Sequence, residues 1–190
     1  MRRLLASLLV LLGLAVVLAS GFALFWSEEL QRLYVPSLPS TEHSAGLKTP
    51  DARVQKARVQ KGSPIGMLEI PRLGLSSIVL EGDDAGALLV GVGHLSDTPF
   101  PWHGGNSVFA AHRDTFFRPL AGIRRNDVIT FSTADAEFEY VVTEMKVVKP
   151  TDLAVLDATP SATLTLITCF PFDYVGPAPN RFIVRAQRRS

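Results

Sequence analysis

The chain has 190 residues, a formal net charge of +1 at pH 7 and a single cysteine, Cys169. A net charge so close to zero argues against a nucleic-acid partner, which usually requires a basic surface. One thiol excludes an internal disulfide framework. Neither CxxC nor HExxH occurs and the four histidines are scattered, so the sequence predicts no metal site.

Residues 1–27 are expected to form a short cytoplasmic tip and a transmembrane helix. An uncharged, leucine-rich run from Leu4 to Trp26 follows two arginines, and a helix needs about 20 apolar residues to cross a bilayer. The arginines favour a cytoplasmic amino terminus, with the rest of the chain outside. A cleaved signal peptide is the alternative, although the run exceeds the roughly 7 to 15 residues of a signal core. Either outcome exports the remainder.

Residues 28–63 are expected to form a juxtamembrane helix and then a flexible stalk. The stretch up to Tyr34 could continue the helix, and Pro36 is the first of several prolines that break it. From Pro36 to about Gly62 the chain is rich in Pro, Ser, Thr, Lys and Arg and shows little apolar periodicity. This composition is typical of a solvated linker.

Residues 64–190 match the usual size of one domain, about 100 to 150 residues. Many short strands divided by turn residues predict a mainly β fold, a barrel or a sandwich with short helices. Strands are expected over residues 65–70, 76–80, 107–111, 128–132, 137–148, 163–168 and 181–187, and helices over 83–90 and 115–123.

Three of these strands begin or end with a reactive side chain. Cys169 follows the strand at 163–168, His112 follows another, and Arg181 opens the last one. A thiolate attacks a carbonyl, an imidazolium can protonate a departing amine, and a guanidinium can hold a developing oxyanion. Taken singly, each residue is more often structural, and a free cysteine is often just a small buried hydrophobe. Together they suit acyl transfer.

In this order the segments resemble the sortases, the membrane-anchored cysteine transpeptidases of bacteria. Residues 165–169, Thr-Leu-Ile-Thr-Cys, look like the family's Thr-Leu-x-Thr-Cys motif. Residues 180–186 look like its arginine strand, and residues 111–115 look like its histidine segment. The similarity covers roughly residues 64–187, and the general pattern is closest to the class D sortases.

The resemblance implies an all-β catalytic domain, an eight-stranded sortase-type β-barrel, after the single transmembrane helix. Cys169 would attack a backbone carbonyl within an LPxTG-like C-terminal sorting signal of an exported protein and form a thioester. His112 would exchange protons with the leaving and incoming amines, and Arg181 would steady the oxyanion. Thr168, beside the nucleophile, would help shape the substrate site.

The same resemblance implies the partners and the location. The acceptor would be an amine of a cell-wall peptide or a lysine of another protein. The enzyme would sit in the bacterial plasma membrane with its catalytic domain on the outer face. No cofactor is implied, although some sortases use calcium and such a site is left open.

These residues also fit other interpretations. A secreted cysteine hydrolase would pass the same acyl group to water, and a catalytically silent, membrane-tethered barrel would bury Cys169. His94 is the rival for catalytic histidine, but it is expected in a Gly-rich loop with its ring capping backbone groups. Asp114 would either orient His112 or act as a local cap. The loop at residues 170–179 lacks a tryptophan found in some sortases, which leaves substrate preference open.

Overall fold

The computed structural model of the protein describes residues 59–189. The expected transmembrane helix and most of the expected stalk lie outside the described residues, so they and the domain limits drawn from them stay predictions. Within residues 59–189, none of the helices has both the length and the apolar character needed to cross a membrane.

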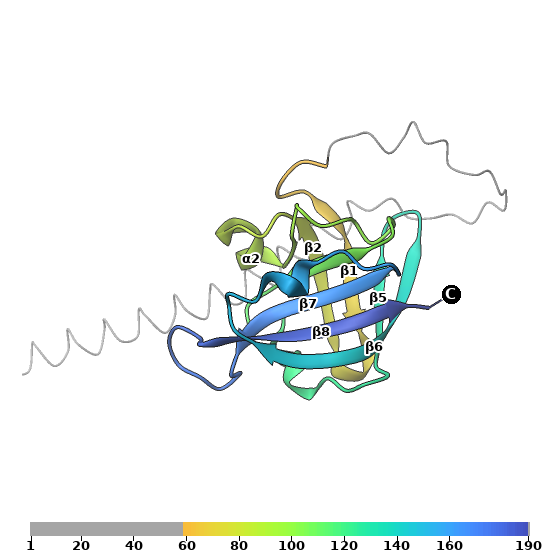
Figure 1. The fold of residues 1–190 in the computed structure, drawn as a ribbon. Helices are drawn as coiled ribbons and strands as arrows, with labels where there is room; N and C mark the ends of the chain where they lie inside the picture. Colours follow the sequence, from red (N-terminus) through yellow and green to blue (C-terminus); the bar gives the residue numbers. More distant parts are fainter. Residues whose placement is uncertain (1–58, 190) are drawn as a thin grey trace, which may run out of the picture. The chain divides into compact units, whose positions relative to one another are not determined.

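Eight strands close into a barrel (Figure 1). They are β1 (Pro64–Ile70), β2 (Leu75–Glu81), β3 (Val92–His94), β4 (Asn106–Ala110), β5 (Val128–Ser132), β6 (Glu137–Val148), β7 (Thr163–Phe170) and β8 (Asn180–Arg188). Around the barrel their order is β1-β2-β3-β4-β7-β8-β6-β5. The β2–β3 and β4–β7 pairs are parallel, and the other neighbours are antiparallel. The predicted eight-stranded barrel is confirmed, and its closure leaves no unpaired sheet edge.

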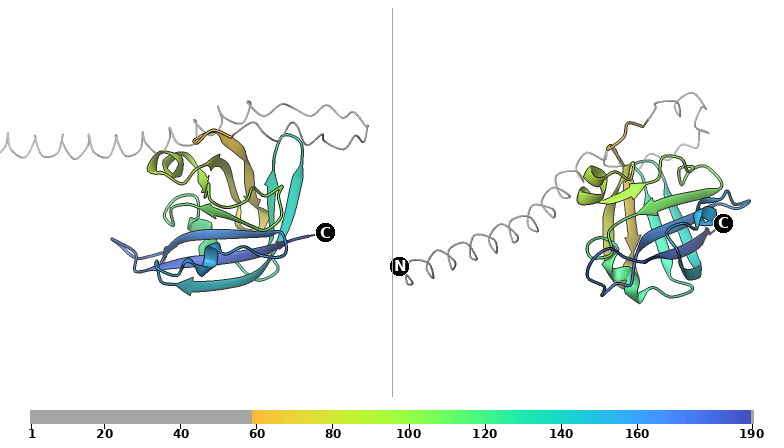
Figure 2. Two further views of the ribbon diagram at one scale, coloured as in Figure 1. Left: turned by 45° about the horizontal axis from the view of Figure 1, so that its top comes forward. Right: turned by 60° about the vertical axis from the view of Figure 1, so that its left-hand side comes forward.

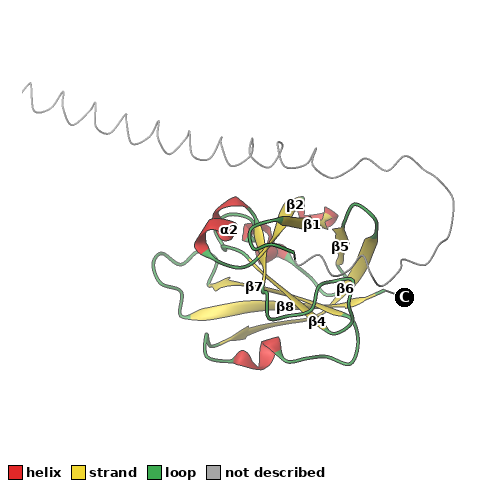
Figure 3. Ribbon diagram, turned by 90° about the horizontal axis from the view of Figure 1, so that it is seen from above, coloured by secondary structure: helices red, strands yellow, loops and turns green. Residues whose placement is uncertain are grey.

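The helical segments in the described chain are short (Figure 3). They are η3 (Pro71–Leu73), α2 (Ala85–Val90), η4 (Arg118–Gly122) and η5 (Leu153–Leu156). The helix predicted over 83–90 is confirmed as α2, which Asp84 caps by accepting hydrogen bonds from the amides of Gly86 and Ala87. Within the range 115–123, where a helix was predicted, the structure has the 3₁₀ helix η4. The buried Phe117 and Leu120 are three residues apart, which suits the three-residue repeat of the 3₁₀ turn found there.

Strand β3 was not predicted from the sequence, which placed His94 in a Gly-rich loop. The glycines of this region allow close packing instead, since a Cβ on Gly93 would lie 2.5 Å from the carbonyl oxygen of Gly82. His94 ends the strand and is only 1% exposed. The loop assignment is therefore wrong. A strand of three residues that includes a glycine is too short for an alternating apolar pattern to be recognised in the sequence.

The alternation of β7 and β8 separates the core from the outer surface. Leu164 and Leu166 of β7 and Val184 of β8 join the apolar cluster that fills the barrel, while the residues between them point to the other face. Figure 2 shows the long strands β7, β8 and β6 side by side from two further directions. The outer face of β7 and β8, at the end where β7 finishes and β8 begins, carries the reactive side chains.

Candidate active site

The topology of the barrel brings the three reactive strand ends to one place. Because β7 and β8 are antiparallel neighbours, the end of one meets the start of the other, and Cys169 is the register partner of Arg181. Because β4 runs parallel to β7, it ends at the same edge, with Ala110 paired to Ile167. His112 lies two residues beyond Ala110, just as Cys169 lies two beyond Ile167.

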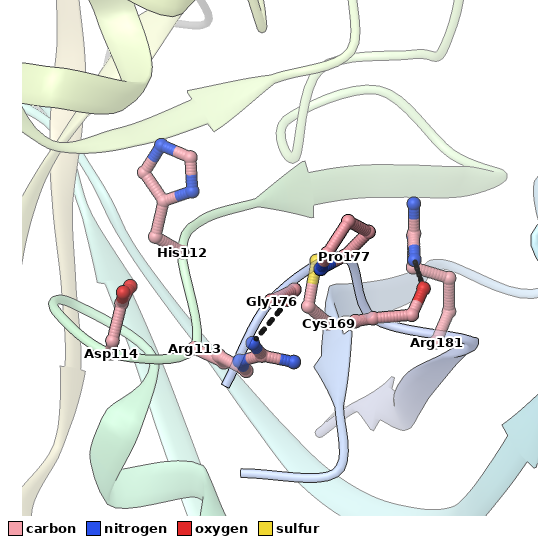
Figure 4. Close-up of a pocket in the computed structure, with 8 residues that line it drawn as sticks. His112, Arg113, Asp114, Cys169, Gly176, Pro177 and Arg181 are labelled. Atoms are coloured by element: carbon pink, nitrogen blue, oxygen red, sulfur yellow. Dashed lines mark hydrogen bonds between the residues drawn. The ribbon is translucent and has the colours of Figure 1, made fainter. Parts of the chain in front are cut away.

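His112, Cys169 and Arg181 line one cavity of about 340 Å³. The other lining residues come from the histidine segment and from the loop that joins β7 to β8: Arg113, Asp114, Gly176, Pro177 and Ala178. Figure 4 shows Cys169 between His112 on one side and Arg181 on the other. His112 is exposed, and the other two are half-buried. The thiol thus opens onto a cavity, whereas a silent barrel was expected to bury it.

The Arg181 guanidinium is fixed by backbone carbonyls. Its Nη1 donates to the carbonyl oxygens of Asn180 at 3.0 Å and Ala178 at 3.4 Å. Directly opposed residues of an antiparallel pair have Cβ atoms about 4.5–5.5 Å apart. The thiol and the guanidinium therefore come from directly opposed backbone positions at one edge of the cavity.

Thr168 lies behind the cavity and does not line it. The residue is 2% exposed, and its hydroxyl donates to the carbonyl oxygen of Ala111 at 2.8 Å. Neighbouring positions of a strand face opposite ways, so Thr168 points inward where Cys169 points outward. The hydroxyl ties the end of β7 to the residue that precedes His112.

Two neighbours of His112 also line the cavity. Asp114 is exposed, and within residues 59–189 its carboxylate makes no hydrogen bond with His112. Arg113 was not recognised from the sequence as functional. Its Nη2 donates to the carbonyl oxygens of Tyr174 at 2.5 Å and Gly176 at 3.0 Å. The sequence shows an arginine directly after the histidine, but it does not indicate which residues this arginine contacts.

His94 is not part of this cavity. Its Nδ1 lies 2.6 Å from Oε2 of Glu81, a carboxylate on the neighbouring strand β2. The ring also stacks on Phe100, with centroids 4.7 Å apart. These contacts give His94 a structural role in the barrel wall. His112, the histidine predicted to be catalytic, shares the cavity with Cys169.

Metal-ligating side chains do not gather anywhere in the described part of the chain, where no group of three or more His, Cys, Asp or Glu residues could hold an ion. The expectation that the reaction needs no cofactor, with calcium activation left open, stays a prediction.

A thiol paired with a guanidinium, with an imidazole in the same open cavity, defines a cysteine-based acyl-transfer enzyme. Residues 68–189 match the family model described as the sortase domain. The chain is 30% identical over 196 aligned positions to Sortase D of Bacillus subtilis, an alignment that covers 99% of each chain. The protein belongs to the sortase family and is a cysteine transpeptidase of that kind. The resemblance to class D sortases is confirmed.

Solved structures agree with this assignment. The structure of a Clostridium perfringens Sortase D5 transpeptidase matches with a TM-score of 0.70, covering 86% of this chain and 98% of that chain at 22% identity, which shows the fold. Sortase C of Clostridium perfringens, solved with a C-terminal cell wall sorting motif, matches with a TM-score of 0.64 at 28% identity, covering 70% of this chain and 74% of that chain.

Proposed function

We propose that this sortase joins exported proteins bearing an LPxTG-like C-terminal sorting signal to an amine acceptor, with Cys169, His112 and Arg181 as its catalytic residues. The observation that carries the proposal is the cross-strand pairing of Cys169 with Arg181 at a cavity that also holds His112. A related sortase C was solved with a C-terminal cell wall sorting motif, which supports a sorting signal as the acyl donor.

In the first half of the reaction the Cys169 thiolate attacks a backbone carbonyl carbon of the signal. The carbonyl oxygen becomes an oxyanion, and the Arg181 guanidinium stabilises it. The C–N bond then breaks, the electron pair leaves with the amine, and the His112 imidazolium supplies the proton. A thioester between the exported protein and Cys169 remains.

In the second half an acceptor amine attacks the thioester carbonyl. Neutral His112 takes the proton from the attacking nitrogen, a new amide forms, and Cys169 leaves as a thiolate. The acceptor amine belongs to a cell-wall peptide or to a lysine of another protein. Water attacking the same thioester would give the free acid, which is the product of the cysteine hydrolase alternative.

The geometry of Arg181 supports this role. Two backbone carbonyls hold its Nη1, and within residues 59–189 its Nη2 makes no hydrogen bond and stays available to an oxyanion. A preorganised donor of this kind needs no reorientation as negative charge develops on the substrate.

We place the reaction at the outer face of the bacterial plasma membrane. The support is the sequence alone: the apolar run from Leu4 to Trp26 would anchor the chain, and the proline-rich segment up to residue 63 would let the barrel reach exported proteins.

The test uses the full chain, purified in a mild detergent, with fluorogenic peptides that vary the LPxTG-like signal. Each peptide is incubated with and without an amine acceptor, beside Cys169→Ala, and the products are identified by mass. An amine-joined product that depends on Cys169 is expected. Free acid alone, whatever the acceptor, would identify a hydrolase. Cleavage that persists in Cys169→Ala would overturn the assignment of the nucleophile.

A further inference from the structure

Asp114 places an unpaired carboxylate next to the catalytic histidine. It lies two residues beyond His112, is exposed, and lines the cavity that holds Cys169. Figure 4 shows Asp114 and His112 together on the side of Cys169 that faces away from Arg181, with the carboxylate directed toward His112. Within residues 59–189 this carboxylate takes part in no ion pair. Its negative charge is therefore available to a molecule that enters the cavity.

The charges that line the cavity are unevenly placed. The two guanidinium groups, of Arg113 and Arg181, donate to backbone carbonyls of the β7–β8 loop and of the start of β8. Among the lining residues, all of them in the described part of the chain, Asp114 is the one carboxylate. The His112 side of the cavity is therefore anionic, whereas the side formed by the β7–β8 loop and β8 is cationic.

The His112 side is where an acceptor amine reacts. In the proposed mechanism His112 takes the proton from the attacking nitrogen, so that nitrogen lies near the imidazole. The groups that follow the amine then occupy the space around His112, where the Asp114 carboxylate lies (Figure 4). A positive charge in that space is attracted to the carboxylate, and a negative charge is repelled. The carboxylate can thus sort acceptors by a second charge, beyond the amine that all of them share.

We propose that Asp114 determines which acceptors the enzyme uses: its carboxylate favours acceptors with a positive charge one residue from the attacking amine and disfavours those with a negative charge there. A peptide whose amino-terminal residue is followed by a basic one belongs to the preferred class. The inference rests on the proposed function and adds to it the chemical class of the acceptor.

Three dipeptide amides with the same attacking amine isolate the effect of the second charge. They are glycyl-argininamide, glycyl-glutaminamide and the α-amide of glycyl-glutamate, and the guanidinium of the first stays protonated and leaves the glycine amine as its nucleophile. The full chain in detergent is given one cleavable signal peptide, and kcat/KM is measured for each acceptor from the joined product. The variants are Asp114→Asn, which removes the charge at nearly constant shape, and Asp114→Lys, which reverses it.

The wild-type chain is expected to prefer the arginine acceptor, then the glutamine and then the glutamate acceptor. An exposed ion pair corresponds to about 2-fold to 5-fold in affinity. With a similar repulsion of the anion, kcat/KM for the arginine acceptor should exceed that for the glutamate acceptor by roughly 4-fold to 25-fold. This ratio should shrink at high salt, which screens exposed charges. It should fall toward one in Asp114→Asn and drop below one in Asp114→Lys.

Asp135→Asn is the matched control. Asp135 is an exposed carboxylate between β5 and β6 and does not line the cavity, so this change alters the net charge by the same amount. It should keep the wild-type ratio.

Equal kcat/KM values for the three acceptors in the wild-type chain would overturn the inference, as would a wild-type ratio that persists in Asp114→Asn. A uniform loss for all three acceptors, with the ratio kept, would also overturn it, because Asp114 would then act on the reaction without distinguishing acceptors. None of these results touches the proposed function, which would fail only if the wild-type chain formed no amine-joined product dependent on Cys169.

Discussion

Replacing Thr168 with valine should impair catalysis more than stability. The change keeps the shape of the side chain and removes the hydroxyl that donates to the Ala111 carbonyl at 2.8 Å in a 2% exposed position. Losing a buried hydrogen bond and leaving a carbonyl unpaired costs about 1–3 kcal/mol. A domain is typically stable by about 5–15 kcal/mol, so the variant should fold, with a lower Tm. Because Ala111 precedes His112, the histidine also loses a fixed anchor to the strand that carries Cys169.

The control for this experiment is Thr165→Val, the same change on the same strand. Thr165 is fully buried, and its hydroxyl donates to Oδ1 of Asn106 at 2.6 Å, near the far end of the β4–β7 pair. Both variants should lose a similar free energy of unfolding in urea. Only Thr168→Val should also lower kcat/KM for peptide cleavage, because only this variant loosens the segment that carries the general acid His112. Each 1.4 kcal/mol added to the activation free energy lowers kcat/KM about tenfold. Equal kcat/KM values in the two variants would refute the anchoring role of the hydroxyl.

Three further predictions concern the barrel. Gly66→Ala should destabilise the fold by roughly 1–3 kcal/mol in urea unfolding, because the new Cβ would lie 2.4 Å from the Ser132 carbonyl oxygen; an unchanged midpoint would contradict this packing. Hydrogen bonds from Arg72 lower the pKa of Asp127, so this pair stabilises the fold above the unfolded carboxyl pKa of about 3.9 and loses that effect as the pH falls through the lower folded value. Asp127→Asn should flatten the acid branch of a stability profile below about pH 4. Burial raises the pKa of Tyr140 to about 12, so the neutral phenol favours the folded state below about pH 10, and this contribution is lost as the pH rises toward 12. The free energy of unfolding of Tyr140→Phe should therefore fall less steeply over this pH range than that of the wild-type chain.

The strands with clear alternation were predictable from the sequence, and the contacts between distant segments were not. The bounds of β5 (Val128–Ser132) and β6 (Glu137–Val148) agree with the prediction residue for residue. The period-2 pattern of these strands is a local property, which is why it can be read without the fold. The three-residue strand β3 has no such pattern. The contact of Arg113 with Tyr174 spans 61 residues, and no local pattern encodes it.

The positions of the reactive residues were likewise predictable only in part. The sequence places Cys169, His112 and Arg181 at strand ends, but many arrangements of eight strands would leave them apart. What brings them together is that β7 lies between a parallel neighbour, β4, and an antiparallel one, β8. The family resemblance implied this order, whereas periodicity alone could not choose among topologies.

The packing of the core and the exposure of the thiol follow from the same alternation. Along β7 the positions of Leu164, Leu166 and Thr168 are buried and face the interior, which leaves Cys169 on the outer face opposite Arg181. A slip of β7 by one residue would turn the thiol inward and move the leucines out of the apolar cluster to outer-face positions. Burying a leucine is worth about 1.5–3 kcal/mol, so the free energy that holds the core together also keeps the nucleophile in the cavity. Core substitutions that preserve volume and alternation should therefore lower stability before they lower kcat/KM.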